Sequence, residues 1–252
     1  MRIYDKSEQT ENTVSKIMVK KILRDGGITE TETLMINEHQ IDVFVNEDKI
    51  LSLMCSNEYL PYLVLGHMIS EGICEGTEGI ESITICENGR QARIQADPEN
   101  SFETDRDTKR PLKKTDRTFI EPAESKLFES QVFGIIDCFT KKDKELHRAT
   151  GGTQSCYLFY EGDLIFSCED IRRHNALDKV IGFLYAEGKD AAKAAVFTTG
   201  RVPADMARKL IRAGIPLLIS KAVPSLDAVT LAKEYGLSLI CRAWPDSYQL
   251  YS

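Results

Sequence analysis

The chain has 252 residues, 42% of them hydrophobic, which is enough to form one large domain or two smaller ones around a packed core. A formal net charge of -7 at pH 7 argues against sequence-independent binding to nucleic acid but is compatible with a local basic pocket. No apolar run approaches the roughly 20 residues that cross a bilayer, and residues 1–9 lack an apolar signal core, so we predict a cytoplasmic protein without membrane contact.

Residues 1–96 are predicted to form a small α+β domain. Residues 17–23 carry a weak strand signal, and apolar residues then alternate on both sides of residues 37–40, which predicts a β-hairpin over residues 33–45. Further short apolar runs predict three more strands, at residues 51–54, 80–85 and 92–94.

One amphipathic helix is predicted in this domain. Apolar residues recur at helical spacing over residues 58–71, and Gly72 is suited to end the helix. His67 lies among these apolar positions, so we interpret it as a core or boundary histidine rather than as a ligand.

Residues 97–126 differ in composition from the rest of the chain. Acidic and basic residues crowd this stretch and apolar residues are few, so it cannot bury much surface. We therefore predict a polar, charged linker between the N-terminal domain and a second domain formed by residues 127–252.

The second domain is predicted to be an α/β domain. After a helix over residues 127–139, residues 157–159 and 164–167 predict a β-hairpin. Strand and helix patterns then alternate, with strands at 194–198, 217–220 and 237–241 and helices at 204–212 and 226–235. This alternation predicts parallel strands joined by right-handed crossovers.

Residues 169–182 connect the end of a predicted strand to an amphipathic helix, where α/β proteins put their chemistry. If the helix begins near Asp170, then Asp170, His174 and Asp178 fall one turn apart and share a face. The helix N-terminus and the neighbouring carboxylates act in opposite directions on the proton of His174, so no direction is predicted for its pKa.

Two glycine-containing turns lie at predicted strand ends. Residues 150–152, Thr-Gly-Gly, precede a strand, and residues 199–201, Thr-Gly-Arg, lie between a strand and a helix. Glycine lets backbone N–H groups approach an anion, and an arginine fork binds phosphate. Together with the neighbouring cations Arg172, Arg173 and His174, these turns predict an anion-binding cleft at the carboxyl edge of a sheet, suited to a nucleotide.

Structural alternatives exist for these features. The glycine pair at 151 and 152 can form a simple tight turn, and Arg173 can form an ordinary ion pair with Asp178 on a solvated helix. Trp244, the only tryptophan, can stack on a flat base or serve as a packing plug.

The stretch Glu-Asp-Ile-Arg-Arg-His-Asn-Ala-Leu-Asp-Lys-Val-Ile-Gly at residues 169–182 resembles the signature of the formate dehydrogenase accessory sulfurtransferases. Shorter similarities lie at residues 70–73, 150–152, 199–201 and 242–247. The resemblance implies a cytidine-deaminase-like three-layer α/β domain with a mixed sheet, beside the smaller N-terminal α+β domain. It also implies that the protein receives sulfur from a cysteine desulfurase and delivers it to the molybdenum cofactor of formate dehydrogenase or a related molybdoenzyme. Family analogy alone suggests a homodimer.

By this resemblance the ligand is the molybdenum bis(molybdopterin guanine dinucleotide) cofactor, which a guanine nucleotide can mimic. The residues expected to bind it lie in the two glycine turns, in the signature and near the C-terminus. They are Thr150, Gly151, Gly152, Asp170, Arg173, His174, Asn175, Gly200, Arg201, Arg242, Ala243, Trp244, Pro245, Asp246 and Ser247.

Three departures from the family pattern concern the site itself. Arg172 stands where the family usually has glycine, and Gln154 stands where it usually has histidine. Family members also carry a Cys-x-x-Cys pair in a loop upstream of the Thr-Gly-Gly motif, and one of those thiols carries the persulfide. Here no cysteine lies between Cys86 and Cys138.

The seven cysteines show no metal-site spacing, so no metal site is predicted. The absence of the His-x-Glu and Pro-Cys-x-x-Cys ligands argues against a zinc deaminase. Cys156 and Cys168 are the remaining weak candidates for a sulfur-carrying thiol, although both lie in predicted strands, where burial makes a thiol inert. We therefore hypothesise a family member that binds the cofactor but has lost or relocated its persulfide site. The alternatives are a non-catalytic cofactor-binding chaperone for a molybdoenzyme and an enzyme acting on another nucleotide.

Overall fold

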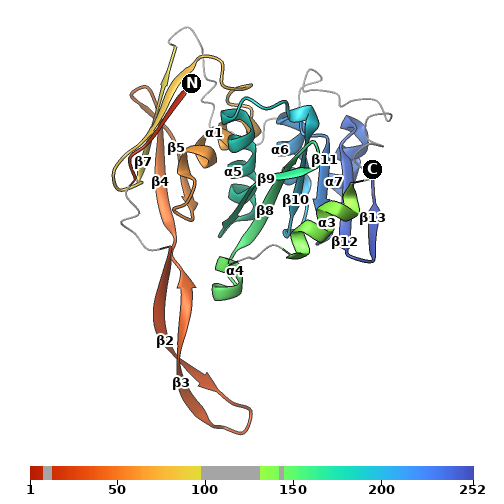
Figure 1. Cartoon of the computed structure of the whole chain (residues 1–252). Coiled ribbons are helices and arrows are strands. Elements are labelled where there is room, and N and C mark those ends of the chain that lie inside the picture. The colour runs from red at the N-terminus through yellow and green to blue at the C-terminus, as the bar shows by residue number, and fades with distance from the viewer. Residues whose placement is uncertain (8–12, 98–130, 142–144) are drawn as a thin grey trace.

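The computed structural model describes residues 1–7, 13–97, 131–141 and 145–252. Nearly all of the predicted linker, and the first residues of the helix predicted over 127–139, lie outside the described residues. The described part contains two larger sheets and a separate two-stranded ribbon, with helices between and beside the sheets (Figure 1). None of the helices in this part is long and apolar enough to cross a membrane.

The N-terminal sheet has five strands in the order β1-β6-β7-β4-β5. Their bounds are β1 Arg2–Asp5, β4 His39–Val45, β5 Asp48–Cys55, β6 Ile80–Ile85 and β7 Gln91–Ala96. Buried and exposed residues alternate along β4 and β7, and the buried ones share a core with α1 (Leu60–Ser70). This confirms the helix predicted over residues 58–71. It also confirms the strands predicted at 51–54, 80–85 and 92–94, which are β5, β6 and β7.

The second sheet has six strands in the order β13-β12-β11-β10-β8-β9. Their bounds are β8 Gln154–Tyr160, β9 Asp163–Asp170, β10 Ala194–Thr198, β11 Leu217–Ser220, β12 Ser238–Trp244 and β13 Ser247–Leu250. As predicted, β8 and β9 form a hairpin and β10, β11 and β12 are parallel. Because β8 and β13 pair antiparallel with β10 and β12, the sheet is mixed.

Helices cover both faces of this mixed sheet. On one side are α5 (Arg173–Ala186), α6 (Ala204–Arg212) and α7 (Leu226–Tyr235), and on the other is α3 (Val132–Lys141); α4 (Glu145–Thr150) and the 3₁₀ helix Ala191–Lys193 are short connections. Successive residues of β8 pack on opposite faces of the sheet. Leu158 packs in the core with α5 and α6, whereas Tyr157 packs edge-on against Phe139 of α3. The result is a three-layer α/β arrangement, which confirms the predicted α/β class.

Two glycines bring α1 and α5 into backbone contact. A Cβ atom at Gly66 would lie 1.7 Å from the carbonyl oxygen of Asp178, and one at Gly182 would lie 1.9 Å from the carbonyl oxygen of Tyr62. A residue with a Cβ atom would therefore clash with the backbone of the facing helix at either position. The apolar residues of the N-terminal sheet and of one face of the second sheet consequently belong to one continuous core.

β2 (Val14–Ile22) and β3 (Ile28–Ile36) form the separate ribbon, which we call the arm and which projects from the body of the molecule (Figure 1). The hairpin predicted over residues 33–45 is therefore wrong, since β3 pairs with β2, and β4 pairs with β5 and β7. The turn of the arm contains Gly26 at a φ of 86°, which suits glycine. Apolar alternation identifies a strand, but the partner depends on contacts outside that strand.

Candidate functional site

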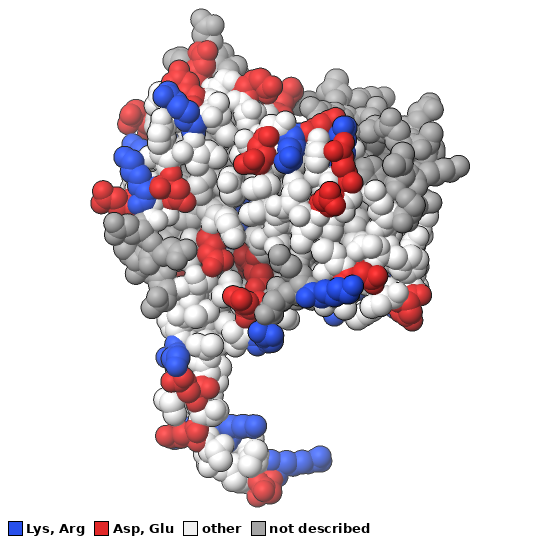
Figure 2. Space-filling model, in the orientation of Figure 1, with Lys and Arg blue, Asp and Glu red and all other residues white. Residues whose placement is uncertain are grey.

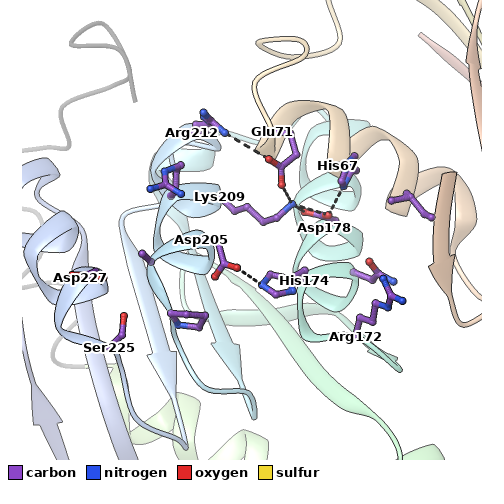
Figure 3. A pocket seen from close by; sticks show the side chains of 15 residues that line it. His67, Glu71, Arg172, His174, Asp178, Asp205, Lys209, Arg212, Ser225 and Asp227 are labelled. Atoms are coloured by element: carbon purple, nitrogen blue, oxygen red, sulfur yellow. Dashed lines mark hydrogen bonds and ion pairs between the residues drawn. The ribbon is translucent and has the colours of Figure 1, made fainter. Parts of the chain in front are cut away.

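A cavity of about 740 Å³ opens between α1, α5, α6 and α7 (Figure 3). Its volume lies within the range of roughly 300–1,000 Å³ that is usual for small-molecule sites. Most of the residues that line it are of polar or charged type; the wall consists of Leu53, His67, Glu71, Arg172, His174, Asn175, Asp178, Pro203, Ala204, Asp205, Arg208, Lys209, Arg212, Ser225 and Asp227. The cavity lies where the strands of the second sheet lead into their helices, the usual ligand position in α/β proteins.

Three helices begin at this cavity. α5 starts after Arg172, α6 after Pro203 and α7 after Ser225, and all three cap residues line the wall. The Ser225 hydroxyl accepts the Ala228 N–H at 3.2 Å, whereas Arg172 and Pro203 provide no side-chain cap. The positive ends of three helix dipoles therefore converge on the same space and favour an anion there.

Arginine side chains add positive charge around these helix starts. Arg172 and Arg208 line the cavity and make no ion pair with another described residue. A smaller hollow of about 210 Å³ adjoins the cavity at Pro203 and Ser225 and is lined by Arg173 and Arg201. The site as a whole can thus present several guanidinium groups to one anionic ligand.

Arg173, whose side chain lines this hollow, has an unsatisfied donor. Its Nε atom is buried and has no hydrogen-bond partner among the described residues. Gly200 makes room for the side chain, because a Cβ atom there would lie 3.1 Å from the Cβ atom of Arg173. A buried N–H without a partner is costly, so an anion oxygen that accepted from it would be favoured. Arg173, Gly200 and Arg201 are therefore brought together, as the predicted cleft requires.

The opposite end of the cavity is closed by a buried ionic network around Asp178. Its carboxylate lies 2.9 Å from the Lys209 Nζ, 3.0 Å from the His67 Nδ1 and 2.7 Å from the Ser70 hydroxyl. Lys209 also contacts Glu71 at 2.6 Å. Burial alone would raise the pKa of Asp178, but the Lys209 ammonium and His67 outweigh it and lower that pKa to about 2.

The alternative of an ion pair between Arg173 and Asp178 is not realised, because Asp178 faces the interface of α1 and α6 while Arg173 faces the hollow. His67 is a partnered boundary histidine, as interpreted, although it also lines the cavity. Lys209 could not be assigned a role from sequence. A lysine within a charged helix is indistinguishable from a solvated one until the helix that faces it is known.

Asp170 anchors the start of α5 instead of lying on it. Its buried carboxylate accepts the N–H groups of Ser56 at 3.1 Å and of Arg172 at 3.0 Å, and lies 2.7 Å from the Lys179 Nζ. The helix begins at Arg173, so the shared face predicted for Asp170, His174 and Asp178 is wrong for Asp170. His174 and Asp178 do both line the cavity.

Two neighbours of Asp170 complete this part of the site. The Asn175 amide is bound to the Asp170 carboxylate at 3.0 Å and to the Met54 carbonyl oxygen at 2.7 Å, so it too holds the scaffold. The His174 Nε2 lies 2.9 Å from the Asp205 carboxylate, and this hydrogen bond lowers the pKa of Asp205. The pair joins the starts of α5 and α6 across the cavity (Figure 3).

Comparison with known proteins decides the family. Residues 36–252 match the sequence model of the FdhD/NarQ family. The chain belongs to the FdhD/NarQ family. Among its relatives, the sulfur carrier protein FdhD of Listeria monocytogenes is 26% identical, with 90% of this chain and 92% of that protein aligned. The sulfur carrier protein FdhD of Thermoplasma acidophilum is 38% identical over a shorter stretch, covering 41% of this chain and 37% of its own length.

A solved structure has the same fold. The crystal structure of a formate dehydrogenase accessory protein from Desulfotalea psychrophila superposes with a TM-score of 0.74 and 26% sequence identity. The match covers 94% of this chain and 96% of the other. The resemblance identified from residues 169–182 is therefore confirmed.

The Thr-Gly-Gly turn of this FdhD/NarQ chain is internally satisfied. The Gly151 N–H donates to the His147 carbonyl oxygen at 2.7 Å, and the Gly152 N–H donates to the Thr150 hydroxyl at 3.1 Å. Glu169 then accepts the N–H groups of Leu146 and His147, which start the short helix before the turn. The geometry supports the tight-turn alternative, because neither glycine N–H is left to face an anion.

The C-terminal residues predicted for the site lie at the end of β12 and in its turn to β13. The Arg242 N–H donates to the Ala222 carbonyl oxygen, and Trp244 is 45% exposed with the Lys221 ammonium 4.7 Å from its ring centroid. Residues 242–247 line neither the cavity nor the hollow. The predicted convergence of both glycine turns, His174 and Trp244 on one hollow is therefore not observed.

The candidate thiols of this FdhD/NarQ chain are enclosed. Cys156 and Cys168 are buried and lie opposite each other on β8 and β9. Burial raises the pKa of Cys156 to about 12 and raises that of Cys168 well above its ordinary value. The predicted burial of both thiols is confirmed. Among the described residues, no group of three or more His, Cys, Asp or Glu side chains is arranged to hold a metal ion.

Proposed function

We propose that this protein is a formate dehydrogenase accessory protein that binds the molybdenum bis(molybdopterin guanine dinucleotide) cofactor through the phosphates of one guanine nucleotide arm. Membership of the FdhD/NarQ family supports the accessory role, because its relatives are named sulfur carrier proteins FdhD and a formate dehydrogenase accessory protein. The cavity supports the nucleotide part, because its volume suits one nucleotide and three helices start at its wall.

The unsatisfied Nε atom of Arg173 carries this proposal. The Arg173 side chain lines the same hollow as Arg201, and the hollow shares Pro203 and Ser225 with the cavity. A diphosphate placed between the hollow and the helix starts would accept hydrogen bonds from both guanidinium groups. Each such charge-assisted bond is worth about 1.5–3 kcal/mol, so the pair is expected to dominate the affinity.

Calorimetric titration with GDP tests the proposal. The wild-type protein is expected to bind GDP more tightly than ADP, and Arg173→Ala and Arg201→Ala are each expected to weaken GDP binding by roughly 10- to 100-fold. Arg93→Ala is the matched control, since Arg93 lies on β7, outside the cavity and the hollow. Equal affinity in all four proteins would contradict the proposed site.

We further propose that Cys156 and Cys168 do not carry sulfur in this chain. A sulfur-carrying thiol must be accessible as the thiolate, and burial opposes that form at both positions. The protein is to be incubated with a cysteine desulfurase and cysteine and then examined by intact mass and peptide mapping. A persulfide on Cys156 or Cys168 would refute this part of the proposal, whereas an unmodified protein supports a cofactor-holding chaperone.

The third candidate, an enzyme acting on a nucleotide, is favoured by one observation. Asp178 holds the Nδ1 side of the His67 imidazole at the wall of the cavity, which is how a general base is oriented. Incubation of GDP and GTP with the protein, followed by chromatography, separates the candidates. Unchanged nucleotide supports the chaperone; turnover that is lost in His67→Phe supports the enzyme.

A further inference from the structure

The arginines of the hollow bind phosphates and cannot distinguish one nucleotide base from another. Acidic and basic side chains are mixed over the face of the molecule that Figure 2 shows, and the chain carries a net charge of -7. A surface of this kind does not attract one nucleotide in preference to another. Recognition of the base must therefore come from individual groups that line the cavity.

Among the described residues, four carboxylates line the cavity, and three of them have partners within the protein. Asp178 and Glu71 contact Lys209. Asp205 is hydrogen-bonded to a histidine at the start of α5. The fourth, Asp227, makes no hydrogen bond or ion pair with another described residue. Its carboxylate oxygens are therefore available to a ligand.

Asp227 lies next to the proposed phosphate site. It is in the first turn of α7, two residues after Ser225, and Ser225 lines both the hollow and the cavity. Figure 3 shows both residues on the α7 side of the cavity. A nucleotide whose phosphates lie in the hollow can thus extend past Ser225 and place its base at Asp227.

An unpaired carboxylate is unfavourable in a cavity that binds an anion, because the two negative charges repel each other. The repulsion is offset if the same ligand brings N–H groups that the carboxylate can accept, since hydrogen bonds to a charged group are among the strongest in proteins. Asp227 therefore favours a ligand that is anionic at one end and carries hydrogen-bond donors at the other.

Guanine carries such donors. Its N1–H and its 2-amino group lie side by side, and both can donate to the two oxygens of one carboxylate. Adenine has an unprotonated N1 acceptor and no 2-amino group at the same edge, so a carboxylate there disfavours it. Arg208 also lines the cavity without an ion pair to another described residue, and an arginine is the usual partner of guanine O6 and N7.

We propose that Asp227 is the residue that selects guanine, by accepting the N1–H and the 2-amino group of the base while the diphosphate lies against Arg173 and Arg201. This inference rests on the proposed function, because it takes the hollow as the phosphate site. The base occupies the cavity and the phosphates occupy the hollow, so separate substitutions test the two parts of the nucleotide.

Calorimetric titration of the wild-type protein with a series of diphosphates measures the selectivity. GDP is expected to bind most tightly. Inosine diphosphate lacks the 2-amino group and loses one hydrogen bond to the carboxylate, so its Kd is expected to be about tenfold higher. Xanthosine diphosphate has a carbonyl oxygen in place of that amino group. This oxygen would face the carboxylate, so the Kd is expected to be at least about 100-fold higher than for GDP.

Asp227→Asn is expected to reverse this order. The asparagine amide can donate to the xanthine oxygen and accept from N1–H, so xanthosine diphosphate is expected to bind about tenfold more tightly than GDP. The Kd for GDP itself is expected to rise roughly 10- to 100-fold. Pyrophosphate has no base and is expected to bind at least as tightly as to the wild type, because one negative charge has been removed.

Glu234→Gln is the matched control. Glu234 is an exposed carboxylate on the same helix, outside the cavity and the hollow, so this variant is expected to keep all wild-type affinities. Thermal unfolding of both variants establishes first that the fold is intact.

The outcomes separate this inference from the proposed function. Equal affinity of the wild type for GDP and xanthosine diphosphate would overturn the inference, and so would an unchanged order in Asp227→Asn. If GDP binding still fell in Arg173→Ala, the proposed function would stand. Loss of pyrophosphate binding in Asp227→Asn would assign Asp227 a structural role and would also overturn the inference. A wild-type protein that bound no nucleotide would overturn both proposals.

Discussion

The two ends of the cavity are built in opposite ways. At the closed end, Asp178 is surrounded by Lys209, His67 and Ser70, and the buried charges are paired. At the open end, α5 and α6 begin without a side-chain cap and the Arg173 Nε atom has no partner among the described residues. Buried polar groups that have hydrogen-bond partners within the protein stabilise the fold, whereas groups without such partners remain able to bind a ligand. The comparison assigns stability to one end and binding to the other.

The largest effect is expected where the closed end depends on backbone contact. Gly66→Ala and Gly182→Ala each place a methyl group within 2 Å of a carbonyl oxygen, which α1 and α5 can relieve only by separating. We expect losses above about 4–5 kcal/mol, with little folded protein. Circular dichroism and urea unfolding measure this.

Gly134→Ala is the control for that substitution. Gly134 lies in α3 with nothing within 4 Å of its Cβ position, so alanine there should stabilise by up to about 1 kcal/mol. Wild-type stability in Gly66→Ala would show that the two helices are not in contact.

Lys209→Met is expected to have the next largest effect. It leaves the Asp178 charge buried without its ammonium partner, which costs about 3–5 kcal/mol in unfolding free energy. Lys193→Met removes an exposed ion pair with Glu161 and should leave the unfolding curve unchanged. Equal urea midpoints for the two variants would show that the buried ion pair at the closed end contributes no more stability than an exposed ion pair.

The pH dependence of stability reports on the same carboxylate. The folded pKa of Asp178 is about 2, below its ordinary value near 3.8, so its contribution is present above about pH 4 and is lost as the pH falls towards 2. The expected loss is about 2 kcal/mol. Urea unfolding at a series of pH values should show a smaller acid dependence in Asp178→Asn than in the wild type; parallel curves would contradict the assignment.

The smallest effect on stability is expected at the open end. Arg173→Met removes a side chain whose Nε atom has no partner, so the unfolding free energy should not fall by more than about 0.5 kcal/mol. GDP binding should nevertheless fall, as proposed above. A large loss of stability would mean that Arg173 is a structural residue, and the open end would then resemble the closed one.

Local signals in the sequence predicted most of the second sheet and its helices. The Ser225 hydroxyl caps α7 by accepting a backbone N–H of its first turn, and Gly236 ends the helix at a φ of 71°, which suits a residue without a Cβ atom. Both effects act within one turn of the chain. The signature at residues 169–182 likewise identified the family and placed the start of a helix at the site. Both kinds of information lie within a few consecutive residues.

Contacts between distant segments could not be predicted in the same way. The arm pairs β3 with β2 rather than with β4, and Asp178 takes Lys209 rather than Arg173 as its cation. Trp244 carries no local mark that separates stacking on a ligand from its contact with Lys221.

The sequence by itself therefore determined the α/β class, the family and the residues that start and end the helices, because these depend on side chains near one another along the chain. The tertiary structure alone decided which charges are buried and paired, which arginines remain available, and which thiols are enclosed. Those outcomes depend on what packs against each side chain, and the packing partners come from remote parts of the chain.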